Sequence, residues 1–193
     1  MNIQPVTLEG RIIRLEPLAE SHAEDLSEVV SLDLLKYSFP PDELSPEGYR
    51  VYIRNLNARV DMQPFAKVLI ETGKTVGMTT YMDIHAEHRW LEIGSTWIAE
   101  PYQGTNVNPE SKYLLLRHAF EDQNAMRVQL KTDSRNKQSQ RAIEKLGAKY
   151  EGTLRNHYIM PDGHIRHTVM YSIIDSEWQD VKTQLEQRLG YAP

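Results

Sequence analysis

The sequence predicts one α/β (α+β) domain in which a central sheet of about seven strands is covered by helices on both faces. The sheet is expected to be mixed but mostly antiparallel, because two pairs of strand-like runs are joined by short turns. Runs rich in β-branched and aromatic residues alternate with amphipathic helical segments. The chain has 193 residues, of which 40% are hydrophobic and 25% charged, with no repeat or low-complexity linker. We therefore expect a single domain over residues 1–193.

The first part of the chain predicts a strand followed by two helices. Residues 11–18 have the composition of a strand. Ser21, with Glu24 three residues later, forms a capping-box pattern at the start of the first helix. Ser45 followed by Pro46 predicts the start of the second, with the serine as cap and the proline as first helical residue.

The middle and the end of the chain predict a hairpin, further strands and three more helices. The expected elements are strands at 65–71, 75–83 and 89–98, a helix to about 122, a strand at 127–132, a helix at 136–146, strands at 149–159 and 164–174, and a last helix from Ser176 and Glu177. Turns at 72–74 and 160–163 close the two hairpins, and Gly147 is a helix stop.

Composition excludes several classes of protein. With no cysteine, the chain has no disulfide, thiolate nucleophile or cysteine-bound zinc. Its net charge of −5 argues against a nucleic-acid partner. We also expect no membrane partner, because no apolar run is long enough to span a bilayer and the N-terminus lacks the layout of a secretory signal. A cytoplasmic location is the expectation.

Residues 100–120 predict a short turn that opens directly into a helix. Gly104 lets the backbone approach a ligand closely, and the unpaired N–H groups of a helix N-terminus attract anions. The alternative is an ordinary capped helix, with Asn108 as cap, Pro109 first and Glu110 in the first turn. Both interpretations stay open on local grounds, because a capped terminus can still bind phosphate.

Two longer segments carry a family resemblance. Residues 91–110 read LEIGSTWIAEPYQGTNVNPE, and residues 136–148 read NKQSQRAIEKLGA. With these segments in this order, the chain resembles the GCN5-related N-acetyltransferase (GNAT) family from about residue 7 to residue 174. Within the family it is similar to the ribosomal-protein-alanine N-acetyltransferases (RimJ/RimL-like). The resemblance implies the GNAT fold, a single N-acetyltransferase domain over residues 1–193, and acetyl-CoA as the acyl donor.

The resemblance also implies a cofactor site. The expected cofactor-binding residues are Trp97, Ile98, Gln103, Gly104, Thr105, Asn106, Val107, Asn108 and Asn136. Main-chain groups of Trp97 and Ile98 would pair with the pantetheine arm, and the loop from Gln103 would wrap the pyrophosphate. Asn106 stands where the family loop usually has a second glycine, so the loop here is expected to be bent differently.

Catalytic roles are implied for two residues. Glu92 lies where the family often places a carboxylate that removes a proton from the amine, although a surface or salt-bridged strand carboxylate is the alternative. Many relatives protonate the thiolate with a tyrosine, and Ile143 takes that place here. The resemblance then implies Ser139 as proton donor, with a helix-surface hydroxyl as the alternative and Tyr150 or Tyr158 as substitutes.

The remaining polar patterns predict no further site. The histidines at 85 and 88 and at 164 and 167 lack a metal-binding motif, so no metal is expected. On the helix after the loop, a solvated face is expected to contain Glu110, Lys112, Glu121 and Asp122.

Together these observations predict an N-acetyltransferase that moves an acetyl group from acetyl-CoA to a primary amine by direct attack in a ternary complex. The amine would belong to a protein N-terminus or a small molecule, held by walls from residues 39–49 and 156–167. A non-catalytic acyl-CoA-binding or regulatory module on the same fold remains the alternative. A homodimer is compatible with the sequence.

Overall fold

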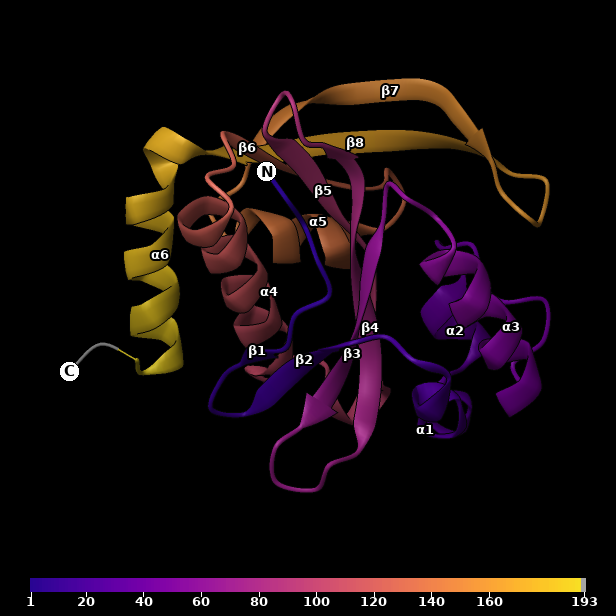
Figure 1. Cartoon of the computed structure of the whole chain (residues 1–193). Helices are drawn as coiled ribbons and strands as arrows, with labels where there is room; N and C mark the ends of the chain where they lie inside the picture. The colour runs from indigo at the N-terminus through magenta and orange to yellow at the C-terminus, as the bar shows by residue number, and fades with distance from the viewer. Residues whose placement is uncertain (192–193) are drawn as a thin grey trace.

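The computed structural model describes residues 1–191, which form one eight-stranded sheet with helices on both faces (Figure 1). The strands are β1 (Leu8–Glu9), β2 (Ile13–Pro17), β3 (Gln63–Leu69), β4 (Thr75–His85), β5 (Trp90–Ile98), β6 (Arg127–Asp133), β7 (Lys149–Ile159) and β8 (Ile165–Ile174). The helices are α1 (Ala23–Val29), α2 (Leu32–Leu35), α3 (Pro46–Asn57), α4 (Val107–Arg117), α5 (Lys137–Glu144) and α6 (Asp175–Leu189).

The strand order is β1-β2-β3-β4-β5-β6-β8-β7. Every neighbouring pair is antiparallel except β5 and β6, which run parallel. This confirms the predicted mixed, mostly antiparallel sheet. The sheet has eight strands instead of about seven, because Leu8–Glu9 adds a short edge strand that lies against β2.

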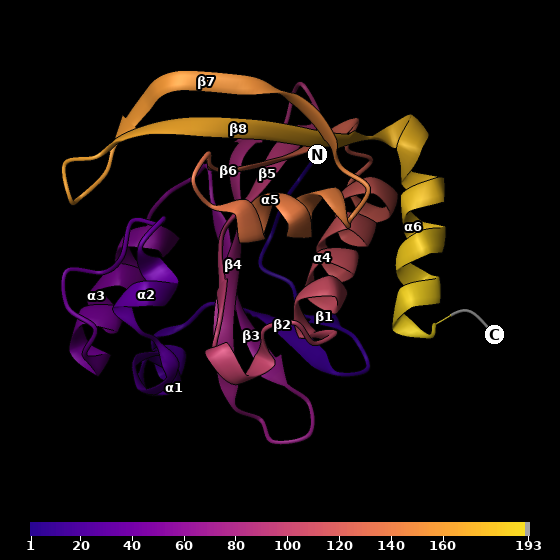
Figure 2. The ribbon, with the colours of Figure 1, turned by 180° about the vertical axis from the view of Figure 1, so that it is seen from behind.

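The helices divide into two layers (Figures 1 and 2). α1, α2 and α3 cover one face of the sheet, and α4, α5 and α6 cover the other. Each layer has its own apolar cluster: Leu115 and Trp178 belong to the one under α4 and α6, whereas Leu26 and Ile53 belong to the one under α1 and α3. No helix within residues 1–191 combines the length and apolarity needed to cross a membrane.

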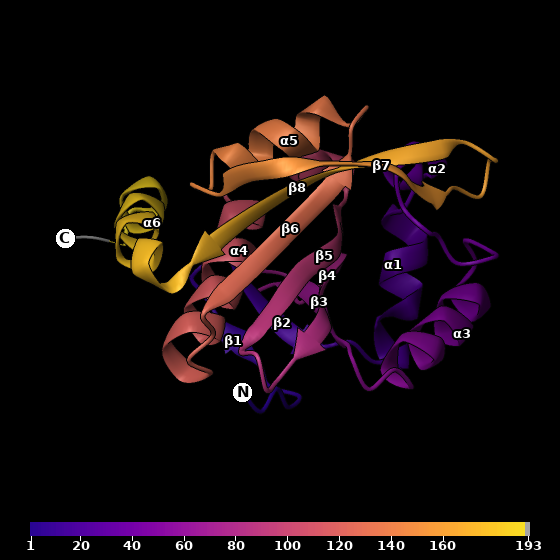
Figure 3. The same cartoon turned by 90° about the horizontal axis from the view of Figure 1, so that it is seen from above.

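The β7–β8 hairpin extends beyond the rest of the sheet, over the end of the molecule where α2 lies (Figure 3). Arg166 on β8 fixes it there, because its Nη1 donates to the carbonyl oxygen of Tyr37, 3.3 Å away, in the segment that follows α2. The hairpin and the α2 segment therefore close the same end of the cleft described below.

The predicted start of α3 is confirmed and that of α1 is wrong. Ser45 Oγ accepts from the N–H of Gly48 at 3.1 Å, with Pro46 as the first residue of α3. Ser21, however, lies inside a 3₁₀ turn, and α1 begins only at Ala23. The side chain that accepts a backbone N–H at this turn is His22, from Ala19 at 3.0 Å.

The start of α4 also differs from the prediction. The helix begins at Val107, two residues before the proline, so Asn108 is not its cap. The Oδ1 of Asn108 instead accepts from Nζ of Lys67 on β3 at 3.0 Å. A contact from a strand distant in sequence has taken the side chain that the local pattern assigned to capping.

Candidate active site

The centre of the sheet opens where two neighbouring strands separate. The parallel pairing of β5 with β6 joins Trp90–Glu92 to Arg127–Gln129 and stops there. Beyond that point a cavity of about 690 Å³ lies between the strands, lined by both of them and by the first turns of α4 and α5. The splay therefore leaves one edge of β5 facing a space large enough for an extended ligand.

The turn before α4 meets the conditions for an anion site. Gly104 has a φ of +75°, a left-handed conformation that favours glycine. Within residues 1–191, the N–H groups of Gly104, Asn106 and Asn108 have no protein acceptor, and they lie at the positive end of the helix dipole. A phosphate would satisfy these donors without disturbing an existing hydrogen bond.

The predicted loop residues do not all face the cavity. Gln103, Gly104 and Asn108 line it. Thr105 and Asn106 are exposed, and Val107 packs into the apolar core. The side chain of Val107 is therefore unavailable to a ligand, which could reach this residue only through its backbone.

The first turn of α5 forms the opposite wall. Asn136 caps this helix, with Oδ1 accepting from the N–H of Ser139 at 2.9 Å, which leaves the amide nitrogen of Asn136 as a donor. Asn136 and Ser139 both line the cavity. Gln138, which the sequence did not single out, bridges the two walls by donating to Oε1 of Gln103 at 3.1 Å.

Trp97 and Ile98 lie on the free edge of β5. On one side they pair with Met78 and Gly77 of β4, and on the other they line the cavity. The β4–β5 register shifts beside them, and Ser95 has a φ of +45°. Such a bulge exposes main-chain groups that a ligand can pair with as an added strand.

Glu92 is fully buried at the base of the splay. Its Oε2 accepts from Gln129 Nε2 at 2.8 Å and forms an ion pair with Lys131 Nζ at 3.0 Å, whereas Oε1 has no partner within residues 1–191. Burial raises the pKa of Glu92, and the two donors only partly oppose this. A carboxylate with a raised pKa and one free oxygen can accept a proton from a ligand in the cavity. The alternative expected for Glu92 was a surface or salt-bridged carboxylate. Glu92 is salt-bridged, but it is not a surface residue.

The second residue after Glu92 is a glycine for a steric reason. A Cβ atom at Gly94 would lie 2.8 Å from Oε1 of Glu92, closer than such contacts allow, and would also meet Met82. The absence of a side chain at Gly94 therefore leaves room for the carboxylate oxygen that has no partner.

Aromatic and basic side chains line the end of the cavity under the hairpin. Phe39 meets Tyr158 edge to face at 5.8 Å, and the guanidinium of Arg166 lies 5.5 Å from the centre of the same tyrosine ring. Two expected walls, residues 39–49 and 156–167, thus meet here, although Tyr49 is buried in the core below α3. Tyr150, by contrast, is 61% exposed and does not line the cavity, whereas Tyr158, the other expected substitute, does.

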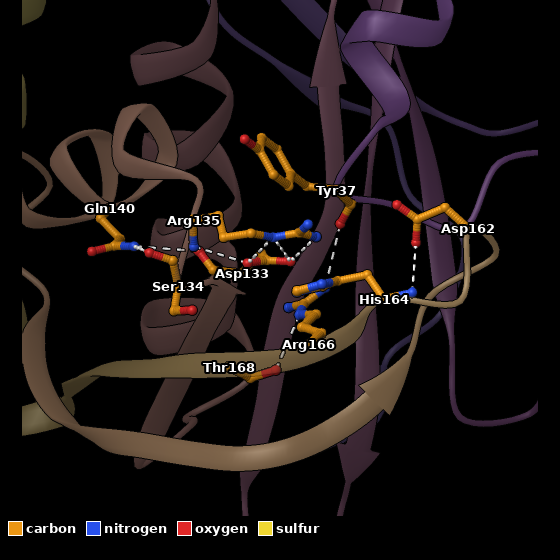
Figure 4. A network of polar contacts seen from close by, with 9 residues as sticks. All are labelled: Tyr37, Asp133, Ser134, Arg135, Gln140, Asp162, His164, Arg166 and Thr168. Atoms are coloured by element: carbon orange, nitrogen blue, oxygen red, sulfur yellow. Dashed lines mark hydrogen bonds and ion pairs between the residues drawn. The ribbon is translucent and has the colours of Figure 1, made fainter.

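A polar network joins this end of the cavity to the start of α5 (Figure 4). Arg135 donates to Asp133 through its side chain, with a shortest distance of 2.8 Å, and its guanidinium lies 5.5 Å from the ring centre of Tyr37. Burial opposes the charge of Asp133, but the hydrogen bonds from Arg135 lower its pKa overall. These contacts connect the β6–α5 turn, which precedes Ser139, to Tyr37 in the segment that follows α2.

The expected solvated face of α4 is wrong for two of its four residues. Glu110 is fully buried and accepts from the N–H groups of Ile12 at 2.9 Å and Ile13 at 2.7 Å. Lys112 is 5% exposed and lines the cavity. The sequence does indicate that Lys112 is buried, because Leu115 and Leu116 follow at the spacing that places side chains on one helix face.

Comparison with known proteins agrees with this geometry. The sequence model described as "Acetyltransferase (GNAT) domain" matches residues 13–149. A crystal structure of an acetyltransferase from T. thermophilus is 39% identical, with a TM-score of 0.90 over 98% of this chain and 100% of that one. The structure titled Mycobacterium smegmatis RimJ in complex with CoA-disulfide is 21% identical and has the same fold. Its TM-score is 0.83, and the match covers 96% of this chain and 95% of that one.

One relative of known name adds a sequence match. YdaF of Bacillus subtilis (strain 168), whose name calls it a ribosomal N-acetyltransferase, is 27% identical over 122 residues. The match covers 63% of this chain and 66% of that relative's length. Because the family model spans well over half of the chain, from β2 to the start of β7, and the fold matches throughout, the chain belongs to the GNAT family of acetyltransferases, which take an acyl group from acetyl-CoA.

Proposed function

We propose that this protein is an N-acetyltransferase that transfers the acetyl group of acetyl-CoA to a primary amine, with both substrates bound in one cavity. The observation that carries the proposal is Glu92, a buried carboxylate with one free oxygen, in the same cavity as the anion-attracting turn at Gly104. A base for the amine and a cradle for the cofactor thus lie on one strand and the loop that follows it. Residues 1–193 would act as one domain in the cytoplasm.

The residues present fit the cofactor. The free N–H groups at Gly104, Asn106 and Asn108 would hold the pyrophosphate, with Gln103, Thr105 and Val107 shaping the turn. The unpaired edge of β5 at Trp97 and Ile98 would hydrogen bond to the pantetheine arm, and Asn136 would donate from the other wall. The bound cofactor supplies an activated acyl group, and proximity in the cavity then supplies much of the rate.

Two side chains would handle protons. Glu92 Oε1 would take the proton that the amine loses as it attacks, directly or through a water. Ser139, on the α5 side, would donate a hydrogen bond to the departing sulfur. The amine itself would enter from the opposite end, beside the contacting rings of Phe39 and Tyr158, and Arg166 would hold the walls of that end in place.

The acceptor that we favour is a protein N-terminus, with a small amine as the second candidate. The names of YdaF and of two structural relatives, a ribosomal-protein-serine and a ribosomal-protein-S5-alanine acetyltransferase from Vibrio species, support the first choice. The exposed mouth under the β7–β8 hairpin is compatible with a chain end that enters while the rest of the protein stays outside.

The first experiment is calorimetric titration with acetyl-CoA, with ATP and NAD as controls. Saturable binding of acetyl-CoA alone is expected, followed by thiol release when N-terminal peptides or small amines are added. If acetyl-CoA does not bind at millimolar concentration, the cofactor assignment is wrong. If it binds but no amine in a broad screen releases thiol, and the Glu92→Gln and Ser139→Ala double variant binds equally, the non-catalytic module is the better description.

A further inference from the structure

Two lysines are buried beside the cavity without an acidic partner. Lys67 on β3 is fully buried and Lys112 on α4 is 5% exposed. Lys67 Nζ donates to Asn108 Oδ1 at 3.0 Å, and Lys112 Nζ donates to Thr96 Oγ1 at 2.7 Å. Within residues 1–191, no carboxylate lies within 4.0 Å of either ammonium group. A buried positive charge whose neighbours are neutral is costly, so such a lysine either gives up its proton or takes an anion as its partner.

Lys112 is the member of the pair that faces the cavity. The two threonines that surround its ammonium also bond to each other, with 2.8 Å between the hydroxyl oxygens of Thr79 and Thr96. Neither hydroxyl therefore depends on the lysine for a partner. The side chain of Lys112 is held in place by groups that do not neutralise it.

Lys112 and Glu92 reach the splay from opposite faces of the sheet. Leu91 and Ile93 belong to the apolar cluster under α4, so Glu92 between them points to the other face. Lys112 comes from α4 itself. The carboxylate thus lies on the acceptor side of the opening and the ammonium on the cofactor side, a few residues apart along β5.

The charge balance of acetyl transfer identifies the anion that this position requires. When the amine nitrogen forms its bond to the acyl carbon, the carbon–sulfur bond breaks and its electron pair stays on the sulfur. The proton of the amine goes to Glu92 on the far side of the sheet. A new negative charge therefore appears on the cofactor side of the splay, where a hydroxyl such as Ser139 can donate a hydrogen bond but carries no charge.

We propose that Lys112 is a further residue of the transfer site, whose ammonium compensates the charge on the cofactor sulfur and gives it the proton that converts thiolate to thiol. This inference rests on the proposed function. After the step, Lys112 is neutral and Glu92 is protonated, and exchange of one proton with solvent at each residue restores both. Lys67 would hold the loop, because its partner Asn108 lies one helical turn nearer the pyrophosphate turn than Lys112 does.

The electrostatic surroundings agree with a proton donor. Burial lowers the pKa of Lys112 to about 7, and Glu92 partly opposes this. Lys67 faces Lys112 from β3, and the two ammonium groups repel, so the pKa of Lys67 is also lowered, first by burial and then by Lys112. On β6, Lys131 is paired with Glu92. A donor whose pKa is near neutrality is suited to release its proton to a thiolate.

The test is the ionisation of the bound CoA thiol, followed by the ultraviolet absorbance of the thiolate as pH is raised. The complex with desulfo-CoA, which lacks the sulfur, serves as the blank. In the wild type the bound thiol should ionise at lower pH than free CoA. In Lys112→Met the thiol pKa should rise by at least about one unit, a tenfold change in the ionisation constant. Lys112→Arg should stay near the wild type, and Lys182→Met, a surface change on α6, is the control.

Binding of the two ligands separates the possible failures. Lys112→Met should bind desulfo-CoA within about twofold of the wild type, because the change acts at the sulfur. If both ligands lose affinity equally, Lys112 serves the phosphate arm and the proposal is wrong. It is also wrong if thiol ionisation is unchanged in Lys112→Met. If the wild type binds neither ligand, the cofactor assignment itself fails.

A second variant guards against misfolding. Thr96→Val removes the hydroxyl that positions Lys112 but leaves the lysine in place. It should raise the thiol pKa in the same direction by a smaller amount. Identical thiol ionisation in Thr96→Val and in the wild type would contradict the proposed position of the ammonium.

Discussion

Lys131 Nζ lies 3.0 Å from Oε2 of Glu92, while Oε1 of the same carboxylate has no partner within residues 1–191. One oxygen is held and the other is free. In the proposed reaction, this division would let the carboxylate keep its orientation and still accept a proton from the amine. Because the pair is formed across β5 and β6 at the point where they separate, the splay that opens the cavity also sets the position of Glu92, the proposed base.

Glu92→Gln should lower kcat by about 10²- to 10⁴-fold, the usual contribution of a general base. The affinity for acetyl-CoA should not change, because Glu92 lies on the acceptor side. In the wild type, kcat/KM should rise with pH as Glu92 loses its proton, through a pKa above the ordinary carboxyl value of 4.5. The variant should lack that rise. Glu87→Gln, in the exposed β4–β5 turn, is the matched control, and equal rates in Glu92→Gln and wild type would exclude the base role.

Gly104→Val should weaken CoA binding more than tenfold. The φ of +75° is strained for any residue with a Cβ and worst for a β-branched one, at about 1–2 kcal/mol. The turn should shift and lose the alignment of its N–H groups. Gly73→Val is a close control, because Gly73 has a φ of +70° and open space around it, as Gly104 has, but lies in the β3–β4 turn. Calorimetry that finds the same CoA affinity in both variants would contradict the cradle.

Ser139→Ala should lower kcat by about tenfold to a hundredfold, the value of a hydrogen bond to a charged atom. The helix start should be unaffected, because Asn136 caps it through the backbone N–H of residue 139, which alanine retains. The dissociation constant of acetyl-CoA should therefore stay the same. Single-turnover kinetics measures the chemical step directly, and an unchanged rate would leave Lys112 as the proton source without help from the serine.

Arg166→Lys should raise the KM for the amine about tenfold and leave CoA binding unchanged. Lysine keeps the charge, but its single nitrogen cannot replace the two nitrogens, Nε and Nη1, with which the guanidinium reaches Thr168 and Tyr37. The α2 segment and the hairpin would then separate at the mouth. Steady-state kinetics with Arg155→Lys, an exposed change on β7, as the reference measures the effect. A fall in kcat with the same KM would instead indicate that Arg166 acts on the chemistry.

Local pattern was sufficient for most of the fold. Residues 65–71 and 75–83 alternate or cluster as strands do, and the structure has β3 and β4 there with ends shifted by up to two residues. The turn-forming residues at 72–74 and 160–163 also predicted both hairpins, because a tight turn depends on local sequence. Ser21 and Asn108 failed as caps because a neighbouring turn and a lysine from another strand took over the hydrogen bonds.

The site was only partly predictable from the sequence. The burial of Glu92 depends on where β5 and β6 separate, and these strands are distant in sequence. Gly104 and Asn136 could be recognised from short segments. The burial of Glu92 could not, since nothing within its own strand shows where β6 separates from β5. The burial of Lys67 is indicated by the sequence, because Lys67 alternates with Phe65 and Leu69, whose side chains face the core beneath α4.

Lys112→Met should stabilise the protein in the absence of cofactor, by about 1–4 kcal/mol near neutral pH, because it replaces an uncompensated buried charge with an apolar chain of similar length. The sign follows from proton binding. The pKa of Lys112 falls from 10.5 to about 7 on folding, so between these values the unfolded chain holds a proton that the folded protein does not. The free energy of unfolding of the wild type should therefore rise with pH across this range.

The difference in free energy of unfolding between Lys112→Met and the wild type should be largest at and below pH 7. It should shrink as pH rises toward and beyond 10.5, where Lys112 becomes neutral in the folded and the unfolded wild type alike. Urea denaturation of both proteins at the two ends of this range measures it, with Lys182→Met as a surface control expected to differ little from wild type. A variant that is less stable than the wild type by the same amount at every pH would show that Lys112 contributes packing, and not a strained charge. A stability gain with a lost function would be the usual mark of a residue kept for chemistry.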